Sequence, residues 1–237
     1  MRYRAILPSV FTIGNLFCGF WALRYVIEGN YVPAAWLIVL GACLDNMDGR
    51  IARLVGKDSR FGVEIDSLVD VCTFGVVPAV MVYRSLFDTG WGSTIAFVFL
   101  LAGAFRLARY NILSQDGEKS EFFAGLPIPM AAIALSQYVV FTERAWSSDH
   151  AATLAVAMVL FLSFLMVSKI EYDPVPNFRS TAIADRIKQL YFLGSIVLIC
   201  LPATSKLFFF PLVLSYLLMG IYRRVWDIFS NEVTQHA

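Results

Sequence analysis

Four aspartates stand in two segments that are otherwise apolar enough to span a membrane. Asp45 and Asp48 lie in the first segment, and Asp66 and Asp70 lie in the second. At 3.6 residues per turn the first pair is about 60° apart around a helix axis and the second about 40°, so each pair faces one way. Ionisable groups in a membrane segment are costly and usually face a bundle interior or a water-filled cavity. The chain must therefore fold with these acids pointing inward, where one or two divalent cations with oxygen ligands would neutralise them.

Two glycines and two arginines accompany the acids. Gly49 directly follows the first pair, and Gly62 stands one turn before the second. A glycine destabilises a helix by about 1 kcal/mol relative to alanine, so its use here favours the close approach of a ligand backbone or phosphate. Arg50 and Arg53 add positive charge, as expected where a phosphate binds beside metal ions. Solvated acids at two helix ends, the simpler interpretation, would leave the glycines unexplained.

The stretch 45–70 resembles the signature of the CDP-alcohol phosphotransferase family, D-x2-D-G-x2-A-R-x8-G-x3-D-x3-D. Every fixed position of that signature is met, at Asp45, Asp48, Gly49, Ala52, Arg53, Gly62, Asp66 and Asp70. The resemblance implies that the four acids hold two divalent metal ions, Mg²⁺ or Mn²⁺. It also implies an enzyme that moves a phosphatidyl-type group from a CDP-linked lipid to an alcohol.

The rest of the chain predicts an all-α, polytopic membrane helix bundle. Of its 237 residues, 58% are hydrophobic and only 16% are charged, well below the roughly 25% charged residues of soluble domains. We expect a single domain over residues 1–237, whose first apolar run is a transmembrane helix and not a cleaved signal peptide. The apolar runs predict about eight spanning segments, at 6–27, 32–53, 62–86, 91–113, 125–142, 151–168, 187–203 and 207–226.

The distribution of lysine and arginine predicts the orientation. With the N-terminus inside, 15 of the 19 fall on the cytoplasmic side, and only Arg24, Arg84, Arg144 and Lys206 fall on the other. Such a bias sets membrane topology. We therefore expect an inner-membrane protein whose termini, acids and polar cavity all face the cytoplasm. The formal net charge of +1 gives no reason to expect a nucleic-acid partner.

Two stretches outside the signature are candidates for the same site. Thr12, Asn15 and Gly19 recur at helical spacing and share a face; this face is either a helix-packing surface of small and polar residues or a wall of the nucleotide pocket. Arg106 and Arg109 stand three residues apart near the end of the segment 91–113. They are either topological anchors or a pair that holds a phosphate or a carboxylate bidentately.

Further stretches resemble the phosphatidylserine synthase branch of the family: 106–111, 123–129 and 166–170. Together with the stretch 8–19, they extend the resemblance over most of residues 1–180. It implies transfer of the phosphatidyl group of CDP-diacylglycerol to the hydroxyl of L-serine, giving phosphatidylserine and CMP. It also implies a homodimer.

The resemblance implies roles for individual residues as well. Asp70 would act as general base for the serine hydroxyl, besides being a metal ligand. The CDP-lipid would be held by Thr12, Asn15, Gly49, Arg53, Ser59 and Gly62. Because the acceptor is an amino acid, its carboxylate needs a cation, and the candidates for acceptor binding are Arg106, Arg109 and Asn111.

Other functions remain open at this point. The same reaction with glycerol 3-phosphate or an inositol phosphate as acceptor would need more basic residues, because these acceptors carry an extra phosphate. A divalent-cation transporter could use the same acids, but transporter sites usually lie near the membrane midplane, whereas these acids cluster near one face. A purely structural membrane protein would have no use for four membrane acids.

Overall fold

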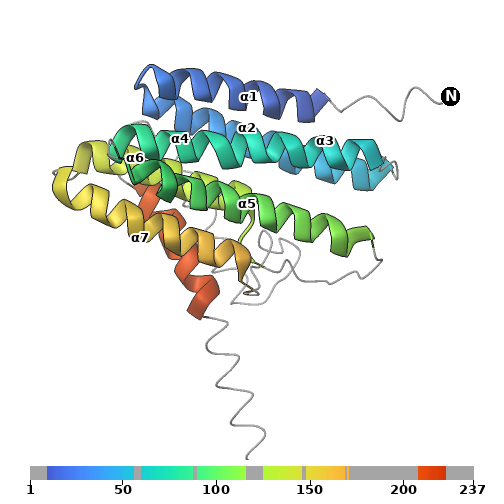
Figure 1. Cartoon of the computed structure of the whole chain (residues 1–237). Coiled ribbons are helices and arrows are strands. Elements are labelled where there is room, and N and C mark those ends of the chain that lie inside the picture. The colour runs from blue at the N-terminus through green and yellow to red at the C-terminus, as the bar shows by residue number, and fades with distance from the viewer. Residues whose placement is uncertain are drawn as a thin grey trace, which may run out of the picture.

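The computed structural model describes residues 10–55, 60–87, 90–115, 125–145, 148–168, 170 and 208–222. All regular structure within these residues is helical. The elements in order are α1 (Val10–Ile27), α2 (Tyr31–Val55), α3 (Arg60–Asp70), the π-helical segment η2 (Val71–Val76), α4 (Val77–Leu86), α5 (Gly92–Gln115), α6 (Ile128–Ala145) and α7 (Ser148–Val167), with a further helix at Phe208–Tyr222. Figure 1 shows them as a bundle in which α3, η2 and α4 follow one line.

Seven of the eight predicted spanning segments overlap a helix of the structure, which confirms the helical membrane bundle. The eighth, 187–203, lies outside the described residues, so the count of eight and the polar cavity open to the cytoplasm stay predictions. Among the described residues, four helices are long and apolar enough to cross a membrane: Val10–Ile27, Phe61–Leu86, Gly92–Ile112 and His150–Val167. Two further apolar helices in the same residues are shorter, Ile128–Glu143 and Phe208–Tyr222.

The outward faces of these helices are apolar. Phe17 and Phe20 on α1 are exposed, and so are Phe97, Leu101 and Phe105 on α5. Side chains three and four residues apart lie on one face of a helix, so each helix presents an apolar stripe to its surroundings. Such a stripe is stable in lipid, and the chain is an integral membrane protein.

A glycine turn makes α1 and α2 antiparallel neighbours. Gly29 has φ +79° and its N–H donates to the carbonyl of Val26 at 3.1 Å, while the N–H of Asn30 donates to the carbonyl of Tyr25 at 2.8 Å. This pair of bonds is the Schellman pattern, which places glycine in the left-handed region after a helix. The turn folds α2 back along α1 (Figure 1), so the polar face of α1 meets the acid-bearing half of α2.

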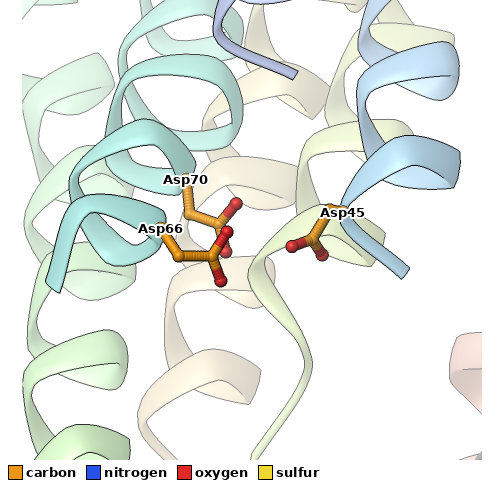
Figure 2. Close-up of side chains that lie close together, drawn as sticks. All are labelled: Asp45, Asp66 and Asp70. Carbon is orange, nitrogen blue, oxygen red and sulfur yellow. The ribbon is translucent and has the colours of Figure 1, made fainter. Parts of the chain in front are cut away.

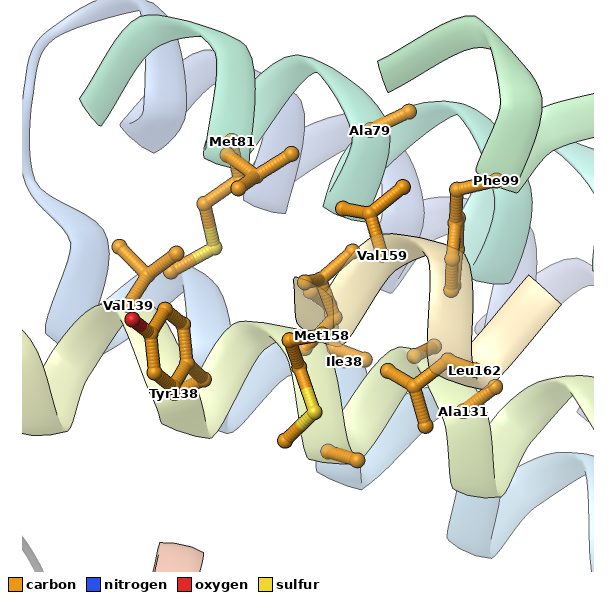
Figure 3. Packing of buried hydrophobic residues seen from close by; sticks show 14 of the residues in the cluster. Ile38, Ala79, Met81, Phe99, Ala131, Tyr138, Val139, Met158, Val159 and Leu162 are labelled. Atoms are coloured by element: carbon orange, nitrogen blue, oxygen red, sulfur yellow. The ribbon is translucent and has the colours of Figure 1, made fainter. Parts of the chain in front are cut away.

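The apolar core lies where α6 and α7 pack with α2, α4 and α5. Ile38, Met81, Phe99, Val139 and Leu162 are buried there, and Figure 3 shows their side chains meeting between the helices. Fully burying a side chain of this size from water contributes about 1.5–3 kcal/mol, although lipid reduces this driving force for membrane helices. This packed half of the bundle supports the more polar end.

The π-helical segment η2 lies at the centre of the bundle. It packs against α1, α2, α5 and α6 as well as against its own continuous helix. The N–H of Val77 donates to the carbonyl of Cys72, five residues earlier, which is the π-helical pattern. Segments of this kind occur often at functional sites, and this one begins directly after Asp70.

Candidate active site

Three of the four motif acids converge. One carboxylate oxygen from each of Asp45, Asp66 and Asp70 lies within 4.8 Å of the others. Figure 2 shows Asp66 and Asp70 on one face of α3, with Asp45 reaching toward them from α2. Asp70 is only 7% exposed, and the other two are half-buried. Carboxylates this close repel one another, and a cation bound between them would relieve that repulsion.

The acid cluster, Asp45, Asp66 and Asp70, fits a divalent metal ion. Mg²⁺ and Mn²⁺ prefer carboxylate oxygens, and three such groups already converge. In addition, Asp66 Oδ1 is buried and has no hydrogen-bond partner among the described residues. A buried acceptor of this kind is normally satisfied, and a bound cation would satisfy this one.

Asp48 lies beside the acid cluster and not within it. It sits one turn further along α2, half-buried, and its carboxylate accepts a hydrogen bond from the Thr12 hydroxyl of α1. It remains close enough to interact electrostatically with Asp45 and Asp66. The structure therefore brings three acids together and holds the fourth next to them.

The polar face of α1 turns toward the acids. Asn15 is fully buried, and its Nδ2 donates a hydrogen bond to Oδ1 of Asp70 at 3.1 Å. Thr12 is 3% exposed and bonds to Asp48. Gly19, on the same face, packs closely against Thr73 of η2. This face is a helix-packing surface that also carries hydrogen-bond donors to the acids. Its contact with a nucleotide stays a prediction.

Arg106 stands beside the acid cluster from α5. It is 8% exposed, and its charge interacts with the carboxylates of Asp70 and Asp45. Its Nε has no hydrogen-bond partner among the described residues. Buried charges are almost always paired and hydrogen-bonded, so Arg106 offers an unsatisfied donor next to the acids.

Arg109, one turn further along α5, meets different partners. Its Nη1 donates to the carbonyl of Val167 at 2.9 Å, and its Nη2 donates to the carbonyl of Ser168 at 3.4 Å. These carbonyls lie at the end of α7, where basic side chains commonly bond the last free carbonyls of a helix. The two arginines predicted as one pair thus have separate surroundings.

The remaining predicted site residues lie on the same helices where they are described. Asn111 Nδ2 donates to the hydroxyl of Ser67 at 2.9 Å, which connects α5 to α3. Gly49 is exposed on α2, and Gly62 is half-buried on α3. Arg53 lies on α2, where only its backbone is described, and Ser59 lies outside the described residues.

Thr73 is a site residue that the sequence analysis missed. It is fully buried in η2, and its hydroxyl donates to the main-chain carbonyl of Asn15 at 3.3 Å. A signal was present, because Thr73 is a polar residue three positions after Asp70 in an apolar run. The helical spacing that singled out the acids would have included it.

Comparisons with known proteins point to the same chemistry. Residues 5–168 match the family model described as CDP-alcohol phosphatidyltransferase. A CDP-diacylglycerol–serine O-phosphatidyltransferase from Helicobacter pylori is 34% identical over 223 residues, covering 92% of this chain and 87% of its own. The protein of the same name from Mycobacterium tuberculosis is 34% identical over 193 residues, covering 76% and 67%. An archaetidylserine synthase from Methanothermobacter thermautotrophicus is 34% identical over 172 residues, covering 71% and 70%.

Proposed function

The chain belongs to the CDP-alcohol phosphatidyltransferase family, and on that premise we propose that it transfers the phosphatidyl group of CDP-diacylglycerol to the hydroxyl of L-serine. The products are phosphatidylserine and CMP. The observation that carries the reaction class is the convergence of Asp45, Asp66 and Asp70 within 4.8 Å. The names of the relatives support serine, over glycerol 3-phosphate or an inositol phosphate, as the acceptor.

We propose that two divalent cations, Mg²⁺ or Mn²⁺, bind at the four motif acids. Asp45, Asp66 and Asp70 form the acid cluster, and Asp48 stands next to it. The chemistry that such ions supply when bound is charge stabilisation of the pyrophosphate and of the leaving CMP. The nucleotide end of the substrate would be bound by neighbouring positions of the motif and of α1, namely Thr12, Gly49, Arg53, Ser59 and Gly62.

Asp70 is proposed as the general base. Its Oδ1 is held by Asn15, so its other oxygen remains to accept the proton of the serine hydroxyl. The serine oxygen then attacks the phosphorus that carries the diacylglycerol, the bond from that phosphorus to the CMP oxygen breaks, and CMP leaves with the electron pair. A positioned general base contributes about 10²–10⁴ in rate.

Arg106 is proposed to bind the carboxylate of the serine acceptor. The support is its burial, its unsatisfied Nε and its place beside the acid cluster. A guanidinium presents a planar fork that matches a carboxylate. Arg109 is a weaker candidate, because its fork already donates to the end of α7.

The test is an acceptor panel. Membranes that contain the protein would be given radiolabelled CDP-diacylglycerol and Mn²⁺, with serine, glycerol 3-phosphate or inositol phosphate in turn. We expect label in phosphatidylserine when serine is present. A higher kcat/KM with either phosphorylated acceptor would overturn the choice of serine. No transfer to any of the three would overturn the reaction class.

We also propose that the site faces the cytoplasm of the inner membrane, where serine is available. The support is the bias of lysine and arginine, since the predicted spans put 15 of the 19 on that side. Reporters fused after Ala237 and within residues 114–122 should both read as cytoplasmic, and an external signal from either would contradict this orientation. The homodimer implied by the family stays a prediction, which crosslinking in membranes would test.

A further inference from the structure

Asn15 of α1 is bonded through both its side chain and its main chain to the continuous helix formed by α3 and η2. The side-chain Nδ2 of Asn15 donates to Oδ1 of Asp70 at 3.1 Å, and its main-chain carbonyl accepts from the Thr73 hydroxyl at 3.3 Å. Asp70 ends α3, and Thr73 lies in η2 just beyond. Both contacts are buried. Two separate bonds therefore fix the position of Asn15 relative to the last acid of the motif.

Glycines on two helices make room for this contact. A Cβ at Gly19 would collide with the Thr73 hydroxyl and lie 3.1 Å from the Thr73 Cα. A Cβ at Gly41 of α2 would lie 2.9 Å from Oδ1 of Asn15 and 3.2 Å from Cγ2 of Thr73. Small residues let membrane helices approach closely, and here the approach places the Asn15 amide between α1, α2 and η2.

The amide of Asn15 is only half satisfied. Its side chain is fully buried, and its Oδ1 has no hydrogen-bond partner among the described residues. An unsatisfied buried acceptor is unfavourable, and a leucine of similar shape would fill the same space without it. Packing alone therefore gives no reason for asparagine here, and its contribution lies in the Nδ2 donor that meets Asp70.

We infer that Asn15 is a positioning residue, whose amide N–H holds the Asp70 carboxylate in one orientation while Thr73 holds Asn15. This role rests on the proposed function, in which Asp70 is a metal ligand and the base. It differs from the sequence expectation that Asn15 contacts the nucleotide. Because Oδ1 of Asp70 accepts the hydrogen bond from Asn15, its other oxygen is available. That oxygen can bind a cation together with Asp45 and Asp66, and it can accept the proton of the acceptor hydroxyl.

The test compares Asn15→Leu with the natural chain in two measurements on the purified full-length protein. The first is Mn²⁺ binding without any substrate, followed by the electron paramagnetic resonance signal of free Mn²⁺. The second is kcat and KM for both substrates. Loss of a residue that orients a metal ligand typically costs about 10–100-fold in affinity or activity. We expect Mn²⁺ affinity and kcat both to fall by that factor, with both KM values and the melting temperature maintained.

A matched control and a second site complete the design. Gln137 in α6 is also a buried amide with an unpaired atom among the described residues, and Gln137→Leu should leave Mn²⁺ affinity and kcat unchanged. Thr73→Val, which removes only the hydroxyl, should lower both in the same direction as Asn15→Leu. Thr73→Ser, which keeps the hydroxyl, should leave Mn²⁺ affinity and kcat at the values of the natural chain.

Several results would overturn the positioning role. The first is an unchanged Mn²⁺ affinity in Asn15→Leu together with a normal kcat. The second is an unchanged Mn²⁺ affinity with a rise only in the KM for CDP-diacylglycerol, which would mean that Asn15 contacts the nucleotide. If Asn15→Leu does not fold, equal behaviour of Thr73→Val and Thr73→Ser overturns the role instead. The Mn²⁺ measurement uses no acceptor, so it remains decisive even if serine is not the substrate.

Discussion

The acid-bearing end of the bundle and α6 differ in where their buried amide, Ser and Thr side chains bond, although the Tyr138 hydroxyl of α6 also donates to the carbonyl of Ala151 in α7 at 2.7 Å. At the acid end, Asn15 of α1 bonds to Asp70 of another helix. In α6, the hydroxyls of Ser136 and Thr142 donate to main-chain carbonyls three residues earlier in the same helix. A bond within one helix is independent of neighbouring helices, whereas a bond between helices fixes their relative position. Polar changes should therefore have distant consequences at the acid end, whereas changes at Ser136 or Thr142 should have local ones.

The two regions also differ in what they contribute, because the α6–α7 half serves mainly stability and the acid end serves mainly function. The α6–α7 half is built from close-packed apolar side chains, such as Val139 and Leu162. The acid end brings three carboxylates within 4.8 Å of one another, which is unfavourable without a cation. Sites built for function are commonly strained in this way. Neutralising an acid should hence cost activity without costing stability, which separates the two regions experimentally.

Removal of divalent metal should have the largest effect. EDTA should abolish transfer, and Mg²⁺ or Mn²⁺ should restore it, because the acid cluster cannot neutralise a pyrophosphate by itself. Metal should also raise the melting temperature, since a ligand that binds only the folded state stabilises it. Full activity in a chelated, metal-free preparation would contradict a metal-dependent acid end and, with it, the functional difference between the two regions.

The next largest effect is expected from Asp70→Asn. The change removes the proton acceptor and a metal ligand, so kcat should fall by at least about 10²–10⁴, while CDP-diacylglycerol still binds. In metal-free buffer the melting temperature should not fall, because the change removes one of three repelling charges. Glu64→Gln is the matched control, since Glu64 lies on the exposed side of α3. Activity of Asp70→Asn within tenfold of the natural chain would exclude Asp70 as the base.

The sequence predicts the acids because their relation is local. Asp66 and Asp70 share a face through helical periodicity alone, and the structure brings them together with Asp45. The place of Asp48 was not predictable in the same way. It is set by the docking of α1, which supplies Thr12 as a partner 36 residues away.

The contacts of Asn15 and the π-helical segment could not be predicted from the sequence either. The bond from Asn15 to Asp70 joins residues 55 positions apart, and it depends on close approach at Gly19 and Gly41. No local pattern marks the start of η2 after Asp70. The helical membrane bundle is readable from apolar runs, whereas contacts between helices depend on packing that no single segment encodes.

Arg106 and Arg109 give the third prediction, because they lie on one helix, α5, but only Arg106 stands beside the acid cluster. Arg106→Ala should raise the KM for serine far more than that for CDP-diacylglycerol, since losing one partner of a buried charge pair costs about 2–5 kcal/mol. Arg106→Lys should rescue poorly, because lysine lacks the planar fork. Arg109→Ala should leave the ratio of the two KM values unchanged and lower stability instead, because it removes the bonds to Val167 and Ser168.

The outcome of the arginine pair is read from the ratio of KM values and from thermal melting in detergent. Equal weakening of both substrates by Arg106→Ala would assign Arg106 to the pyrophosphate or to the fold. A selective rise in the KM for serine caused by Arg109→Ala would exchange the roles of the two residues. No change from either would make both topological anchors and would remove the main mechanistic support for serine.

The smallest effect is expected from Thr142→Val in α6. Thr142 is buried, and its hydroxyl donates to the carbonyl of Val139 at 3.0 Å. Valine keeps the shape, and even a hydrogen bond between two membrane helices averages only about 0.6 kcal/mol. The free energy of unfolding should change by no more than that, and kcat and Mn²⁺ affinity should not change.

The identical substitution at Thr73 makes this small effect informative. Thr73→Val removes a hydroxyl of the same kind, which is also buried and whose bond crosses from η2 to the main chain of Asn15 in α1. Thermal melting should show similar stability for both variants, whereas Mn²⁺ binding should separate them. If Thr142→Val lowered Mn²⁺ affinity as much as Thr73→Val, the loss would come from general loosening of the bundle. A loss confined to Thr73→Val would mean that what matters is the helix to which a buried hydroxyl bonds.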